Sequence, residues 1–356
     1  MATDRSIPNE MWMRRCLQLA RLGASTTAPN PMVGAVLVQG DRILAEGWHV
    51  RTGEAHAEVR CLDAFGDGPV PHDAVLHVNL EPCAHHGRTP PCADLLIARG
   101  VKRVVIGLRD PFPAVASRGI QRLREAGVEV TEGVLPEECR WAQRRFLTSV
   151  ENGRPYIVLK WAASADGFLD RLPRTARKVQ RISTPTTDVL VHRWRTEEEA
   201  ILVGSNTVLH DDPALTVRHI VGRQPLRVVL DRQGRTPMAS KVYDTGTDTL
   251  LFTTTPRPTL PVEQVIMAQE NALDRILAEL HGRRVRSLLV EGGADLLGHF
   301  VARGLWDEAR VIHGQVVFGN GTHAPVLSGA AQVERVFSGD RIVLHRREPG
   351  FIAWDW

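Results

Sequence analysis

Two series of alternating strand and helix patterns, separated by one short polar break, constrain the fold of this chain more than any other feature. In the first series, residues 11–23 and 56–65 have the apolar spacing of amphipathic helices. Residues 74–80 and 101–108 are short apolar runs typical of buried strands. Alternation of this kind predicts an α/β fold in which helices cover both faces of a sheet.

The break is the stretch ENGRPY at residues 151–156, where polar residues, glycine and proline coincide. It follows a closing helix predicted over residues 136–150. The chain has 356 residues, and single cores usually stop growing near ~250–300 residues. We therefore predict two domains, residues 1–150 and residues 154–356.

The second series alternates in the same way. Its predicted strands are residues 156–162, 200–204, 225–231, 249–254, 286–293, 309–319 and 341–347, and its predicted helices are residues 186–195, 270–282 and 294–304. In the first series, residues 32–49 predict a hairpin that turns at Gly40 and Asp41. The stretch RLPRTARKV at residues 171–179 is interpreted as a basic loop.

Composition and charge exclude several classes of protein. The chain is 43% hydrophobic and 24% charged, as globular proteins are. Its net charge of +3 is spread over both halves, so no nucleic-acid partner is expected. No apolar run reaches ~18 residues, so no membrane contact is expected. The charged N-terminus does not resemble a signal peptide, and we expect a cytoplasmic protein with reduced thiols.

The stretch EPCAHHGRTPPC at residues 81–92 is open to three interpretations: a disulfide loop, a structural metal knuckle or the mouth of an active site. Five cysteines, an odd number, argue against a disulfide framework. Three of them, Cys16, Cys61 and Cys139, lie in helical patterns and are expected to be buried, inert thiols.

His56, Cys83 and Cys92 would together make a three-ligand zinc site. Three protein ligands with a fourth position left open are typical of a catalytic zinc, whereas a structural site normally uses four. Glu58 is not a ligand in this arrangement, but it can carry a proton between water and the leaving ammonia. The pattern H-x-E followed by P-C is typical of zinc deaminases.

Eight residues separate the two cysteines, whereas nucleic-acid deaminases typically have two. The longer loop favours recognition of more than a bare base, and Arg88 with Thr89 could hold a phosphate. His85, more than His86, is interpreted as a group on the substrate side. We therefore interpret the stretch as the mouth of an active site.

Several longer stretches support one family. They are PNPMVGAVLV at 29–38, GWH at 47–49, GEAHAEV at 53–59, LEPCAHHGRTPPC at 80–92, DPFPAV at 110–115, LKWAASADG at 159–167, GSNTVLHDDPALTVR at 204–218 and VEGGADLL at 290–297. In this order they resemble the bifunctional deaminase–reductase family of bacterial riboflavin biosynthesis, over nearly the whole chain.

The resemblance implies a cytidine-deaminase-like α/β/α domain followed by a dihydrofolate-reductase-like α/β domain. The first would deaminate 2,5-diamino-6-ribosylamino-4(3H)-pyrimidinone 5′-phosphate with one Zn²⁺ per chain. The second would use NADPH to reduce the ribosyl group of the product to a ribityl chain. The expected partner is thus a small phosphorylated pyrimidine, and a homo-oligomer, dimer or tetramer, is also expected.

Residue by residue, the resemblance places zinc on His56, Cys83 and Cys92 and the proton shuttle on Glu58. Deaminase substrate contacts fall on Asn30, His49 and Arg88, and we add His85. Cofactor contacts fall on Ala163, Thr207, Asp211, Gly293, Ala294, Asp295, Leu296, Leu297, Gly298 and His299. Reductase substrate contacts fall on Arg195, Leu215, Arg218 and Glu291. Lys160, which follows the apolar run of a predicted strand, is added to the substrate site.

The chain departs from the family between Asp166 and Ile182, where the family usually has a serine and a tryptophan and this chain has Val179, Gln180 and Arg181. Arg232 replaces a small polar residue near the cofactor ribose, and its guanidinium could bind a 2′-phosphate. Ser117, Arg118 and Gly119 replace a turn richer in glycine.

Three alternatives stay open at this point. One is a nucleoside or tRNA deaminase with an appended domain, opposed by the cysteine spacing and the VEGGADLL stretch. Another is a non-catalytic protein stabilised by zinc, opposed by Glu58, which the metal itself does not need. The third is a relative whose reductase has changed substrate or lost activity, which the departures near Arg181 leave open.

Overall fold

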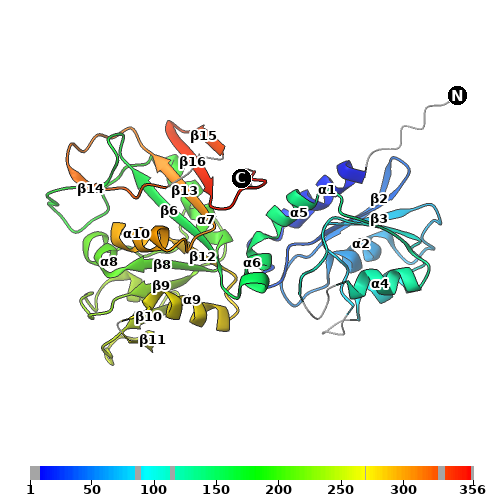
Figure 1. The fold of residues 1–356 in the computed structure, drawn as a ribbon, viewed down its shortest axis with the longest axis horizontal. Coiled ribbons are helices and arrows are strands. Elements are labelled where there is room, and N and C mark those ends of the chain that lie inside the picture. Colours follow the sequence, from blue (N-terminus) through cyan, green and yellow to red (C-terminus); the bar gives the residue numbers. More distant parts are fainter. Residues whose placement is uncertain (1–8, 85–89, 113–116, 269, 328–332, 354–356) are drawn as a thin grey trace. The chain divides into compact units, whose positions relative to one another are not determined.

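The computed structural model describes residues 9–84, 90–112, 117–268, 270–327 and 333–353. The chain divides into two compact units, Met1–Asn152 and Gly153–Trp356 (Figure 1). No helix in the described part of the chain is long and apolar enough to cross a membrane.

The first unit is built on a five-stranded sheet in the order β2-β1-β3-β4-β5. β1 is antiparallel to β2 and β3, whereas β3, β4 and β5 are parallel to one another. The strands are β1 (Gly34–Gln39), β2 (Arg42–Trp48), β3 (Val75–Val78), β4 (Arg103–Ile106) and β5 (Glu129–Glu132). The helices are α1 (Asn9–Arg21), α2 (Ala57–Phe65), α3 (Cys92–Ala98), α4 (Arg118–Glu125), α5 (Pro136–Ala142) and α6 (Arg144–Asn152).

Alternate side chains of β1 enter two different cores, as the period of two in a strand requires. Ala35 and Leu37 pack with residues of α2, α3 and α4. Val36 and Val38 pack with residues of α1 and α5. Helices therefore cover both faces of the sheet, which confirms the α/β/α prediction for this unit.

The second unit contains a nine-stranded sheet in the order β11-β10-β9-β8-β12-β6-β13-β16-β15. The strands from β11 to β13 in that order are parallel, and β16 and β15 add an antiparallel edge. The strands are β6 (Tyr156–Ala163), β8 (Ala200–Gly204), β9 (Leu226–Leu230), β10 (Thr249–Thr253), β11 (Glu263–Ile266), β12 (Ser287–Val290), β13 (Glu308–His313), β15 (Val333–Phe337) and β16 (Asp340–Arg346). A separate ribbon pairs β7 (Phe168–Arg171) with β14 (Gly321–His323).

The helices of this unit are α7 (Pro185–Glu197), α8 (Ser205–Asp211), α9 (Ala272–Gly282) and α10 (Ala294–Ala302), with a short 3₁₀ turn, η1 (Lys241–Tyr243). Ile157 and Leu159 of β6 pack in one core with α9 and α10. Tyr156 and Val158 pack in a second core with Val208 of α8. A parallel sheet with both faces covered places the carboxyl ends of its strands at one edge, where ligands of α/β proteins bind.

Candidate active sites

Three side chains of the first unit converge at the start of two helices. His56 lies directly before α2, and Cys92 is the first residue of α3. The Nδ1 atom of His56 lies 3.3 Å from the sulfur of Cys92 and 3.6 Å from the sulfur of Cys83. All three ligand atoms lie within 4.8 Å of one another.

The donor set fits zinc. With bonds of about 2.3 Å to sulfur and about 2.0–2.1 Å to nitrogen, a tetrahedral zinc would have ligands separated by roughly 3.5–3.8 Å. The observed nitrogen–sulfur distances of 3.3 and 3.6 Å are close to this spacing. Hydrogen bonding from Cys92 lowers the pKa of the Cys83 thiol well below its usual value. This favours the thiolate of Cys83, the form of cysteine that binds metal, whereas the same contact raises the pKa of the Cys92 thiol.

Glu58 is the second residue of α2 and is only 3% exposed. Burial raises the pKa of its carboxyl to about 7, although the nearby His56 charge opposes that rise. A carboxyl group with a pKa near neutrality can both accept and donate a proton at physiological pH. Its place on the first turn of α2 puts it beside His56, as the H-x-E pattern predicts.

Asn30 and His49 form a connected pair beside this cluster. The Nδ1 atom of His49 lies 3.1 Å from the carbonyl oxygen of Ala55, which can only accept, so this nitrogen carries the proton. The Nε2 atom then accepts from the side-chain amide of Asn30 at 3.3 Å. Burial lowers the pKa of His49, which agrees with a neutral ring. Its ring centroid lies 5.5 Å from that of His56.

Two polar residues that sequence reasoning did not assign hold this site in place. Glu81, 4% exposed, accepts hydrogen bonds from the backbone N–H groups of Asp110, Ser117, Gly119 and Ile120 at 3.0–3.2 Å. It thereby fixes the start of α4 beside the segment that carries Cys83. The available signal was the position of Glu81 two residues before Cys83, but its partners are backbone groups that no side-chain pattern reveals.

Asn79 does the same for the segment between the PNP stretch and the start of β1. Its side-chain oxygen accepts from the backbone N–H of Gly34 at 2.8 Å, and its amide donates to the carbonyl of Met32 at 3.0 Å. The predicted substrate residues His85 and Arg88 lie outside the described residues. The expectation that Cys16, Cys61 and Cys139 are buried thiols is confirmed.

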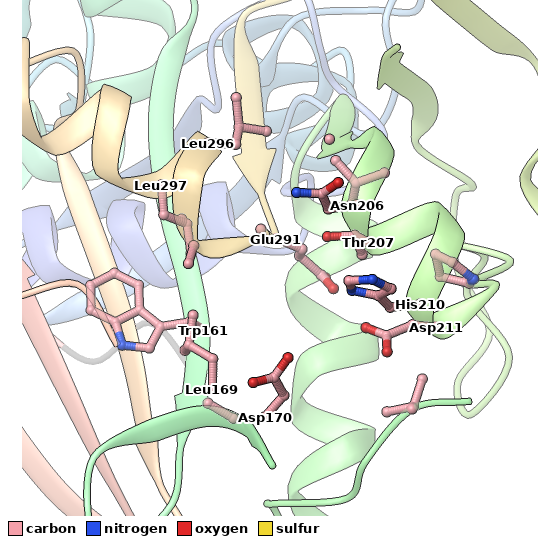
Figure 2. A pocket seen from close by; sticks show the side chains of 18 of the residues that line it. Trp161, Leu169, Asp170, Asn206, Thr207, His210, Asp211, Glu291, Leu296 and Leu297 are labelled. Atoms are coloured by element: carbon pink, nitrogen blue, oxygen red, sulfur yellow. The ribbon is translucent and has the colours of Figure 1, made fainter. Parts of the chain in front are cut away.

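The second candidate site is a cavity of about 860 Å³ at the carboxyl edge of the parallel strands of the second unit. Figure 2 shows side chains from β6, β7, α8 and α10 around it, with Glu291, which follows β12, among them. Most of the predicted cofactor and substrate residues line this cavity: Lys160, Arg195, Thr207, Asp211, Leu215, Arg218, Glu291, Gly293, Ala294, Asp295, Leu296, Leu297 and His299. Ala163 and Gly298 do not line it.

Three of the predicted substrate residues form a buried cluster of charges around one carboxylate. Arg195 donates two hydrogen bonds to the carboxylate of Glu291, at 2.8 and 2.7 Å, and Lys160 lies 4.0 Å from the same group. Burial opposes ionisation of Glu291, but the charges of Arg195 and Lys160 outweigh it and lower the pKa to about 2. Burial lowers the pKa of Lys160.

The stretch at residues 171–179, interpreted from sequence as no more than a basic loop, is attached to the cavity wall by two arginines. Arg174 pairs with Asp170 and with Asp211 of α8. Arg177 donates to the carbonyls of Val208 and Leu209 at the end of α8. Cations at the C-terminal end of a helix are favourable because the last carbonyls are free to accept.

Two departures from the family pattern also line the cavity. Arg181 pairs with Asp188 on the first turn of α7, at 2.5 Å. Arg232, which follows β9, forms no ion pair within the described residues. Both departures therefore place a guanidinium at the cavity wall.

Comparison with known proteins gives two family matches. Residues 155–344 match the RibD C-terminal domain, and residues 7–108 match the cytidine and deoxycytidylate deaminase zinc-binding region. The riboflavin biosynthesis protein RibD of Escherichia coli (strain K12) is 40% identical over 319 residues, which cover 84% of this chain and 86% of that protein. The RibD protein of Aquifex aeolicus is 38% identical over 317 residues, covering 87% and 88%.

Solved structures agree with these matches. A diaminohydroxyphosphoribosylaminopyrimidine deaminase/5-amino-6-(5-phosphoribosylamino)uracil reductase from Thermotoga maritima superposes with a TM-score of 0.87 at 34% identity, covering 95% of this chain and 98% of that one. RibD of Acinetobacter baumannii superposes with a TM-score of 0.84 at 32% identity, covering 94% and 98%. Both likenesses extend across the two units.

Proposed function

This chain belongs to the RibD family of bifunctional riboflavin-biosynthesis enzymes, and from that premise we propose how its two sites divide the chemistry. The first unit is the pyrimidine deaminase and the second is the reductase. The observation that carries the proposal is the convergence of His56, Cys83 and Cys92 within 4.8 Å, with the buried Glu58 beside them. A structural metal site would have no need of that carboxyl group.

In the deaminase unit, His56, Cys83 and Cys92 would hold one zinc ion per chain. Zinc bound in this way lowers the pKa of water toward ~7 and so supplies a nucleophile at neutral pH. Water adds to the pyrimidine carbon that carries the amino group, and ammonia leaves. Glu58 takes the proton from the water and delivers it to the departing nitrogen. Asn30 and the neutral His49 orient the ring through their amide and imidazole groups.

In the reductase unit, the cavity would hold NADPH and the deaminated ribosylamino pyrimidine together. NADPH supplies the hydride that reduces the sugar at C1 and converts the ribosyl group to a ribityl chain. Glycine at 292 and 293 and the first turn of α10 offer free backbone N–H groups to the cofactor diphosphate. Thr207 and Asp211 face the same cavity from α8.

The substrate's phosphate is assigned to the cationic side of this cavity. Arg195 is already neutralised by Glu291, whereas Arg218 pairs with no carboxylate within the described residues. An unpaired guanidinium that lines a cavity is suited to a phosphate, which it can bind bidentately. Arg218 is therefore the proposed phosphate contact, and Lys160 and Glu291 the proposed contacts of the polar sugar. Association into a dimer or tetramer stays a prediction.

The experiment is turnover of the purified protein on the pathway pyrimidine, with and without NADPH. We expect ammonia release in both cases. When NADPH is present, we also expect it to be oxidised. A second assay supplies the deaminated intermediate directly and follows NADPH absorbance. Ammonia release without any oxidation at millimolar cofactor would identify the remaining alternative, a deaminase that carries an inactive second unit.

A further inference from the structure

His192 is a buried polar residue of the reductase cavity to which neither the motifs nor the proposed chemistry gives a role. It lies on α7, three residues before Arg195, so the two side chains share one face of the helix. His192 is 4% exposed and Arg195 is 9% exposed, and both line the cavity.

The imidazole of His192 holds a backbone group of the segment that carries Arg218. Its Nδ1 atom accepts the backbone N–H of Arg218 at 2.9 Å. Because a backbone N–H can only donate, Nδ1 carries no proton and the ring is neutral. Burial, followed by the charges of Arg195 and Arg218, lowers the pKa of His192 to about 4. The ring of His219 packs against it edge-on, with centroids 4.4 Å apart.

The backbone of residues 216–218 is held almost entirely by side chains. Arg195 donates to the carbonyl of Thr216 at 3.1 Å. Gln224 binds both the N–H and the carbonyl of Val217, at 2.7 and 3.0 Å. The segment begins at Leu215, a non-glycine residue with a φ of 55°, a conformation that L-residues seldom adopt without support from their surroundings.

This arrangement directs the guanidinium of Arg218. Its Nη1 atom donates to the hydroxyl of Thr216 at 2.9 Å, while its backbone is tied to His192. The first contact keeps the side chain near its own segment, and the second keeps that segment against α7. If the bond to His192 were lost, the N–H of Arg218 would have no other hydrogen-bond partner among the described residues, and the segment could move away from the cavity.

We infer that His192 is a positioning residue for the reductase: its neutral ring fixes the backbone at Arg218, so that the guanidinium is already placed for the phosphate of the substrate. The inference rests on the proposed function, because Arg218 was assigned there to the phosphate. In this inference the effect of His192 reaches the substrate through Arg218.

The test compares two substitutions at His192. His192→Asn retains an acceptor oxygen close to the position of Nδ1, whereas His192→Leu keeps a similar volume without an acceptor. Hydrogen exchange of peptides covering residues 213–222 reports the backbone directly. The Arg218 amide should lose protection in the Leu variant and keep it in the Asn variant. Equal protection in the wild type and the Leu variant overturns the inference, whatever the activity of the second unit.

Kinetics with the full chain give the functional readout. For the deaminated phosphorylated substrate, His192→Leu should raise KM about tenfold, as loss of one buried hydrogen bond does. Its kcat should change by less than about threefold, because hydride transfer is untouched. KM for the same substrate without its phosphate should not change, and His192→Asn should stay near the wild type. Equal defects in the Leu and Asn variants would mean a packing role and overturn the inference. Ammonia release by the first unit checks folding.

The pair of residues can then be tested as a unit. In an Arg218→Ala background, His192→Leu should add no further increase in KM, because the two changes remove the same contact to the phosphate. Additive effects would overturn the inference. If Arg218→Ala alone leaves KM unchanged, the phosphate assignment in the proposed function is wrong and the inference falls with it. If Arg218→Ala raises KM but His192→Leu leaves the protection of the Arg218 amide unchanged, the inference about His192 is wrong and the phosphate assignment stands.

Discussion

At the scale of single residues, Glu58 supports the proposal of a catalytic rather than a structural metal site. It supplies no ligand atom, yet it is buried beside His56, and burial raises its pKa to about 7. A buried carboxyl group is costly to keep, and the side chain that hydrogen-bonds to this one is Cys92, itself a proposed metal ligand. Its position is better explained by proton transfer than by stability.

Glu58→Gln should therefore separate metal binding from catalysis. The amide cannot take up a proton, so ammonia release should fall by at least ~10²–10⁴-fold, the usual contribution of a general acid–base. Zinc content, measured by elemental analysis, should stay at one ion per chain, whereas His56→Ala should lose it. Near-normal deamination by the Gln variant would remove the assigned role.

His77 predicts a pH dependence of stability in the first unit. It lies in β3, is 1% exposed, and its Nε2 atom donates to Asn9 at 3.1 Å. Burial lowers its pKa to about 4. The ring of His77 therefore binds a proton more readily in the unfolded chain than in the folded one. The contribution of His77 to stability is present above pH ~6.5 and is lost as pH falls toward 4, by at most ~1.4 kcal/mol per pH unit.

The measurement is calorimetric unfolding of the full chain between pH 7 and pH 5. The transition that a zinc chelator shifts belongs to the first unit. In His77→Leu this transition should depend less steeply on pH than in the wild type, while His72→Leu, at an exposed site, should behave like the wild type. Parallel pH profiles for all three proteins would show that His77 does not contribute.

At the scale of elements, the contact between α4 and the cysteine segment should control zinc retention. A Cβ atom on Gly119 would lie 1.9 Å from the carbonyl oxygen of Pro82. Gly119→Ala must therefore push the first turn of α4 away from Pro82 and weaken the bonds of Glu81 to Gly119 and Ile120. We expect a loss of ~1–3 kcal/mol in the free energy of unfolding, typical of overpacking.

Zinc content after dialysis should also fall in Gly119→Ala, because Pro82 precedes the ligand Cys83. Gly68→Ala is the matched control, since a Cβ there meets nothing within 4 Å. If the two variants retain zinc equally, α4 does not support the metal site.

Elements with an apolar run or period could be predicted from the sequence, whereas β15, an edge strand that has neither, could not. The hairpin turning at Gly40 and Asp41 is found as β1 and β2. β1 is an apolar run buried on both faces, and along β2 buried residues alternate with partly exposed ones. β15 has no buried residue, and its pairing with β16 depends on backbone hydrogen bonds that leave no periodic signal. The single closing helix predicted over residues 136–150 is divided into α5 and α6 at Gln143.

The same division holds for the sites. The zinc cluster follows from ligand chemistry and spacing, which the sequence displays directly. The contacts of Glu81 and His192 could not be predicted in this way, because these side chains bind backbone N–H groups that lie 26 to 39 residues away in the sequence. Any residue type except proline offers such a group, so the pattern of side chains contains no sign of it.

At the scale of the whole molecule, the division into two units predicts that the activities can be separated by metal removal. Treatment with 1,10-phenanthroline should abolish ammonia release, because the three proposed ligands all lie in the first unit. NADPH oxidation on the supplied deaminated intermediate should continue at its original rate. Added zinc should restore deamination, and a parallel loss of both activities would contradict the separation.

The order of strands in the two sheets has a consequence for synthesis on the ribosome. In the first unit all five strands lie within residues 34–132, so its sheet can close before the second unit has been translated. In the second unit β6 emerges first but lies between β12 and β13. At ~5–20 residues per second, this apolar strand waits on the order of ten seconds for neighbours that begin roughly 130 residues later. During that interval the backbone N–H and C=O groups of β6 are not yet paired with those of β12 and β13, and its apolar side chains are exposed. The second unit is therefore the part of the chain that should most need a chaperone.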